Sequence, residues 1–116
     1  MAKYSVVFHL DESAWARTST VISNVENLIA DLGEGNVEVE VVATGEGITA
    51  YLRVPSLHGQ RFERLGARGV RLVACANSLR AAGLPKEAML ASVEVVPSGV
   101  GELVRKQAEG WAYVRP

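Results

Sequence analysis

The chain has 116 residues, of which 48% are hydrophobic and 22% are charged, and its formal net charge is −1. This balance is typical of an ordinary folded protein, and the length predicts a single domain over residues 1–116. The 12 basic residues are scattered, which argues against nucleic-acid binding, and no apolar run approaches the roughly 20 residues that a membrane span needs.

The first predicted elements are a strand at 3–10 and a helix at about 13–32. "KYSVVFHL" is rich in β-branched and aromatic residues, and the mixed polarity of the chain start does not resemble a signal peptide, so we expect a cytoplasmic protein. Asp11 or Ser13 is the expected N-cap of the helix. Apolar residues at three- and four-residue intervals predict one buried helix face: Val21, Ile22, Val25, Leu28, Ile29 and Leu32.

The second predicted strand, at 36–44, alternates valines with Glu38 and Glu40. One polar face predicts a strand at or near a sheet edge. The following "GEGITA" matches the dinucleotide-binding pattern G-x-G-x-x-A, but it follows the second strand rather than the first, and the short chain leaves little room for such a site. We therefore interpret it as a turn and a short helix before Pro55.

The rest of the chain continues the alternation of helices and strands. A helix at about 58–67 precedes an apolar strand at 70–75, and "ANSLRAAGLPKEAML" predicts two short helices. "SVEVVPSG" predicts a fourth strand, "GVGELVRKQAEG" a last helix and "WAYVRP" a terminal strand. Such alternation predicts an α/β fold: a three-layer, doubly wound, mostly parallel five-stranded sheet. We expect the flavodoxin-like strand order 2-1-3-4-5.

In this order a ligand site would lie between the carboxyl ends of the first and third strands. His9 ends the first strand and Cys75, the only cysteine, ends the third, so an imidazole and a thiol are expected on neighbouring strands. We expect Cys75 to be exposed at the rim of the sheet. Because a helix follows at once, its amides and dipole would favour the thiolate.

Each candidate also has a structural interpretation. A lone cysteine after an apolar run is often a small buried hydrophobe, and His9 could instead hold a loop by hydrogen bonds. Asn77 and Ser78, directly after Cys75, are candidate ligand-binding residues, as is Asn27, which flanks the buried helix face and could equally be solvated. One cysteine with two histidines is too few for a structural zinc site, and we expect no metal or cofactor.

Five segments of the chain form a familiar pattern: "VVFHLDE", "NVENLIADLG", "VEVEVVATGEGITAYL", "GVRLVACANSLRAAGL" and "VEVVPSGVGELVRKQAEGWAYVRP". Taken together, they resemble the DsrE/DsrF-like family of small sulfur-metabolism proteins. The resemblance covers nearly the whole chain in order, and its most specific parts are the lone cysteine with the following Asn-Ser-Leu and the ending "SGVGEL…Q…GWAYVRP". It implies a flavodoxin-like fold, a homo-oligomer (trimer or hexamer), and a cysteine that carries sulfur as a persulfide, here Cys75.

The leading hypothesis is therefore a sulfurtransferase-like carrier that exchanges sulfur with separate donor and acceptor proteins. Cys75 would hold the persulfide, and His9 would position or protonate the departing group. The alternative is a non-catalytic oligomeric module that binds a small ligand or a partner at the same cleft, with Cys75 structural.

Overall fold

The computed structural model describes residues 2–116, which form a five-stranded sheet with helices around it. Its elements in chain order are β1 (Tyr4–Leu10), α1 (Trp15–Leu32), β2 (Val37–Ala43), the 3₁₀ helix η1 (Gly45–Tyr51), α2 (Gly59–Ala67), β3 (Arg71–Cys75), α3 (Ala76–Ala82), the 3₁₀ helix η2 (Lys86–Ala88), β4 (Val93–Val96), α4 (Gly99–Ala108) and β5 (Ala112–Val114). Within these residues no helix is both long and apolar enough to cross a membrane.

The strand order is β4-β3-β2-β1-β5, and every neighbouring pair is parallel. The α/β class and the parallel sheet are therefore as predicted, but the expected order 2-1-3-4-5 is wrong. The error lies in β2, which pairs with β1 on one side and β3 on the other instead of forming an edge. Its alternating Glu40 suggested an exposed face, whereas the Glu40 side chain is buried in the structure.

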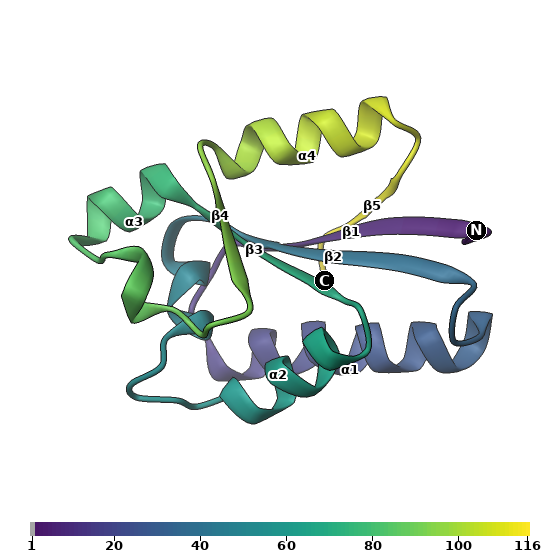
Figure 1. The fold of residues 1–116 in the computed structure, drawn as a ribbon, viewed down its shortest axis with the longest axis horizontal. Coiled ribbons are helices and arrows are strands. Elements are labelled where there is room, and N and C mark those ends of the chain that lie inside the picture. Colours follow the sequence, from purple (N-terminus) through teal and green to yellow (C-terminus); the bar gives the residue numbers. More distant parts are fainter. Residues whose placement is uncertain (1) are drawn as a thin grey trace.

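The helices cover both faces of the sheet because the chain reverses its direction of travel once. From β1 to β4 each step moves the same way across the sheet, and right-handed crossovers place α1 and α2 on one face. The return from β4 to β5, beside β1, runs the opposite way and places α4 on the other face (Figure 1). Figure 1 also shows α3 beyond the ends of the strands rather than over a face.

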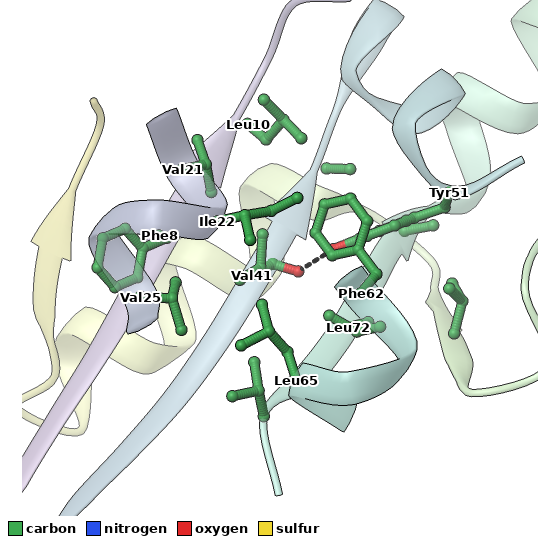
Figure 2. Close-up of a cluster of buried hydrophobic side chains, with 14 of the residues drawn as sticks. Phe8, Leu10, Val21, Ile22, Val25, Val41, Tyr51, Phe62, Leu65 and Leu72 are labelled. Carbon is green, nitrogen blue, oxygen red and sulfur yellow. Dashed lines mark hydrogen bonds between the residues drawn. The ribbon is translucent and has the colours of Figure 1, made fainter. Parts of the chain in front are cut away.

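The larger hydrophobic core lies between the sheet and the α1–α2 layer (Figure 2). Val21, Ile22 and Val25 of α1 are fully buried there, as their helical spacing predicts. The Tyr51 ring packs edge-on against Phe62, and its hydroxyl donates a 2.6 Å hydrogen bond to the Val41 carbonyl. Because its ring is buried and its hydroxyl has a hydrogen-bond partner, Tyr51 holds η1 against the sheet and α2.

The start of α1 differs from the expectation. Its N-cap is Ala14, which makes no side-chain capping bond. Asp11 instead accepts hydrogen bonds of 2.9 and 3.2 Å from Arg115, so it holds the C-terminal tail rather than the helix. The G-x-G-x-x-A segment forms η1, and a Cβ on Gly47 would lie 2.7 Å from the Leu10 carbonyl carbon. That glycine is therefore needed for close packing against the end of β1.

Candidate functional site

A row of polar residues lies at the carboxyl ends of the strands, on the face covered by α4. A small core on this face joins Val7, Val42 and Val73 to Leu103 of α4. Because side chains alternate along a strand, the residues two positions further on point the same way. They are His9 after Val7, Thr44 after Val42 and Cys75 after Val73.

His9 lies at the point where the sheet reverses its winding, between β1 and β5. Its Nδ1 atom is 2.7 Å from the Tyr113 hydroxyl, and its Nε2 atom is 2.8 Å from the Thr44 hydroxyl. Burial lowers the pKa of His9, the Asp11 carboxylate opposes that effect, and Arg115 adds to it. The imidazole is therefore a fixed, neutral bridge between two hydroxyl groups at neutral pH.

The predicted adjacency of His9 and Cys75 is wrong, because β2 separates their strands. Thr44 occupies the intervening position. Its hydroxyl binds His9, while its methyl group and Cys75 both face Gly99, the first residue of α4. The imidazole and the thiol thus belong to one row but are connected through Thr44.

Cys75 is only 6% exposed, so the expectation of a thiol exposed at the rim is also wrong. The physical reason is the start of α4, which packs over the end of β3. A Cβ on Gly99 would lie 3.1 Å from the Cys75 Cβ and would overlap with the Thr44 side chain. The missing side chain of Gly99 lets the backbone approach the cysteine closely.

The surroundings of Cys75 nevertheless favour its ionised form. Burial raises the pKa of the thiol, but hydrogen bonds more than offset this effect, and the net pKa is lowered. The Ser78 hydroxyl contributes most, followed by the backbone N–H groups of Gly99, Ser78 and Asn77. Donors from the starts of both α3 and α4 therefore converge on one sulfur atom.

Ser78 connects the thiol to the neighbouring η1 segment. Its hydroxyl oxygen accepts a 2.8 Å hydrogen bond from the Gly45 N–H, and the same hydroxyl lowers the pKa of Cys75. A hollow of about 480 Å³ lies between η1 and α3, lined in part by Asn77 and Ser78. The exposed Asn77 side chain accepts a hydrogen bond from Arg80.

Two other polar candidates lie away from the thiol. Asn27 is exposed on α1 and lines a separate groove of about 730 Å³ beside β1 and β5. His58 is buried against Trp15, with ring centroids 4.0 Å apart. Across residues 2–116 no three His, Cys, Asp or Glu side chains gather closely enough to hold a metal ion.

Sequence reasoning missed Thr44, Gly99 and Tyr113. Thr44 ends the predicted second strand, but a strand placed at the sheet edge could not be expected to lie between His9 and Cys75. Ser98, directly before the predicted last helix, was the available signal for Gly99. A helix that begins directly after a strand brings its first N–H groups to the sheet edge.

Comparison with known proteins gives both the family and the fold. The protein of unknown function MTH1491 from Methanobacterium thermoautotrophicum is 48% identical, with a TM-score of 0.93 over 97% of this chain and 99% of that one. The ychN protein from E. coli shares the fold, with a TM-score of 0.77 at 16% identity and the same two coverages. No curated protein matches this chain. The model of the DsrE/DsrF-like family matches residues 2–116, and the chain therefore belongs to that family.

Proposed function

We propose that this protein is a cytoplasmic sulfur carrier that holds a sulfane sulfur on Cys75. The single observation that carries the proposal is the set of hydrogen-bond donors that lower the pKa of this thiol despite its burial. Thiolate is the species that attacks a sulfur–sulfur bond, so a donor-rich surrounding favours the reactive form. The DsrE/DsrF-like family supports a role in sulfur metabolism.

The transfer exchanges one sulfur atom without net oxidation. The Cys75 thiolate attacks the outer sulfur of a donor persulfide, R–S–SH; the new S–S bond forms on Cys75, and the donor leaves as the thiolate R–S⁻. An acceptor thiolate then attacks the outer sulfur of the Cys75 persulfide. This step forms the acceptor persulfide and restores the Cys75 thiolate, so the two steps balance.

The neighbours of Cys75 have distinct roles in this mechanism. Ser78 and the backbone N–H groups of Asn77 and Gly99 stabilise the thiolate, both before sulfur arrives and after it leaves. His9 acts through its contact with Thr44, which it holds beside Gly99. Because Cys75 is 6% exposed, the residues packed over it must move to admit a donor. Asn27 lines a different groove, and we assign it no role in this mechanism.

Separate donor and acceptor proteins are the proposed partners, since one cysteine cannot form an internal relay. We also propose a homo-oligomer, a trimer or a hexamer. Val100 and Val104, one turn apart on the outer face of α4, are 62% and 60% exposed, which supports an association surface there. Light scattering should give a multiple of 12.4 kDa, and a monomer at micromolar concentration would contradict this part of the proposal.

The test of sulfur uptake is intact mass spectrometry after treatment with inorganic polysulfide. Wild type should gain about 32 Da, one sulfur atom, and dithiothreitol should remove it. Reversal by dithiothreitol is essential, because irreversible oxidation to a sulfinic acid adds nearly the same mass. Cys75→Ser is the matched control and should gain nothing. If native wild type also gains no labile sulfur, the carrier proposal fails.

The burial of Cys75 favours a second candidate, a non-catalytic oligomeric module that binds a small ligand or a partner. In that case the thiol packs between α4 and the sheet, and the hollow between η1 and α3 is the binding site. Cys75→Ser would then retain partner binding, whereas the carrier proposal predicts that it loses sulfur exchange.

A further inference from the structure

A buried pair of carboxyl groups lies beneath α4, away from the thiol. Glu40 of β2 is 0% exposed, and its Oε2 atom accepts a 2.8 Å hydrogen bond from Arg71. Its Oε1 atom is buried and has no hydrogen-bond partner. An unpaired buried oxygen of this kind is costly, so the ionised form of Glu40 does not fit its surroundings.

The neighbour that resolves the cost is Glu102, which is also buried. The two carboxyl groups are within hydrogen-bond reach of each other. Two carboxylates are both acceptors, so the contact requires one proton, which Glu40 carries and donates to Glu102. Burial first, and then this hydrogen bond, raise the pKa of Glu40 to about 8, while the same bond lowers the pKa of Glu102.

The charges around the pair come from several packed elements. Lys106 of α4 lies 3.8 Å from Glu40, and Arg105 of α4 lies 3.3 Å from Glu102. Arg71 of β3 also pairs with Glu94 of β4, at 2.8 Å. From the opposite face, Tyr51 is the titratable neighbour: burial raises the pKa of its phenol, and an ionised Glu40 would raise it further. The cations lower the pKa of Glu40, but burial and the Glu102 contact outweigh them.

This pair lies one helical turn from the groups that contact the thiol. The Glu102 N–H donates a 3.0 Å hydrogen bond to the Ser98 carbonyl, and the Ser98 hydroxyl accepts one of 3.1 Å from the Gly101 N–H. Both bonds close the first turn of α4, which begins at Gly99. Whatever holds Glu102 against β2 therefore also holds the Gly99 N–H against Cys75.

We propose that Glu40 and Glu102 are positioning residues for Cys75: the proton shared by their carboxyl groups fixes the first turn of α4, and with it the Gly99 N–H, against the sulfur. This inference rests on the proposed role of Cys75 as the reactive group. It assigns a task to two buried acids that the transfer chemistry itself does not use.

The test is the pH dependence of thiolate absorbance in the ultraviolet, with Cys75→Ser as the blank. This readout requires neither a sulfur donor nor access to the thiol. Glu40→Leu removes the donor, and it should leave about threefold less thiolate than wild type at pH 7, in line with the partial loss of one hydrogen bond to an ionised group. Glu40→Gln, whose amide N–H replaces the O–H donor, should stay close to wild type.

Glu94→Gln is the matched control, because it removes the exposed partner of Arg71 and leaves the buried pair intact. Folded Glu40→Leu with the thiolate titration of wild type would overturn the proposal, and so would Glu40→Gln with a defect as large as that of Glu40→Leu.

If Glu40→Leu does not fold, hydrogen exchange at the Gly99 amide tests the proposal instead. After correction for intrinsic exchange rates, the protection of the Gly99 amide should fall from pH 6 to pH 9 in wild type but not in Glu40→Gln. The same pH dependence of protection in both proteins would overturn the proposal. A chain that passes these tests but gains no sulfur from polysulfide would refute the carrier function and leave the positioning pair standing.

Discussion

Replacing Glu40 by Gln should remove a decline in stability that wild type shows between pH 5 and pH 8. The folded chain keeps a proton on Glu40 because burial, followed by the Glu102 contact, raises its pKa from 4.5 to about 8. The unfolded chain releases that proton near pH 4.5. The stabilisation is therefore fully present below pH 4.5 and is lost as pH rises toward 8.

The magnitude follows from linkage. Within the window the unfolded state binds one proton fewer than the folded state, so the free energy of unfolding falls by ~1.4 kcal/mol per pH unit. Across pH 5 to 8 the loss is on the order of 3 kcal/mol, a large part of the stability of a small domain.

Urea denaturation at each pH measures this effect as the difference between wild type and Glu40→Gln. Glu102 contributes with the opposite sign only below about pH 4.5, because its pKa is lowered by its bond with Glu40. Burial lowers the pKa of His9 and His58, so these residues add stability as pH rises toward 6.5, equally in both proteins. Glu38→Gln, an exposed change on the same strand, is the control. Parallel curves for wild type and Glu40→Gln would refute the buried proton.

Three further substitutions test the surroundings of the thiol and the core. Ser78→Ala should raise the pKa of Cys75, because the largest stabilising hydrogen bond is lost. Alkylation of Cys75 by iodoacetamide at pH 7 should then be about tenfold slower, and an unchanged rate would show that Ser78 does not act on the thiol. Gly99→Ala should destabilise the fold by about 1–3 kcal/mol, since its Cβ would overlap with packed side chains, whereas Gly101→Ala, with contacts no closer than 3.3 Å, should cost clearly less in the same urea experiment. Tyr51→Phe should cost about 1–2 kcal/mol, because the buried Val41 carbonyl loses its 2.6 Å donor, and a neutral result would contradict the importance of that bond.

Much of the fold follows from local patterns in the sequence. The helical spacing of Val21, Ile22 and Val25 and the short β-branched runs predicted the element order, and all five strands lie where expected. The strand order did not follow, because alternation along 36–44 reports polarity rather than exposure. Glu40 looks like a solvent-facing residue, but it is buried and accepts a hydrogen bond from Arg71 inside the protein.

The same residue explains what the sequence could not predict about the site. An edge position for β2 would bring the first and third strands together, and so His9 appeared to neighbour Cys75. With β2 in the centre, Thr44 lies between them. The sequence predicted that Cys75 directly precedes a helix. The burial of Cys75 beneath Gly99, however, depends on where α4 crosses the sheet, and no local sequence pattern predicts that.

The measurement that tests the central claim most directly is the pH profile of Cys75 alkylation in the native protein. We predict reaction without unfolding and a thiol pKa below that of the urea-unfolded chain, because Ser78 and three backbone N–H groups stabilise the thiolate. Modification that proceeds only at the rate of global unfolding, with no lowered pKa, would contradict the account and identify Cys75 as a packing residue.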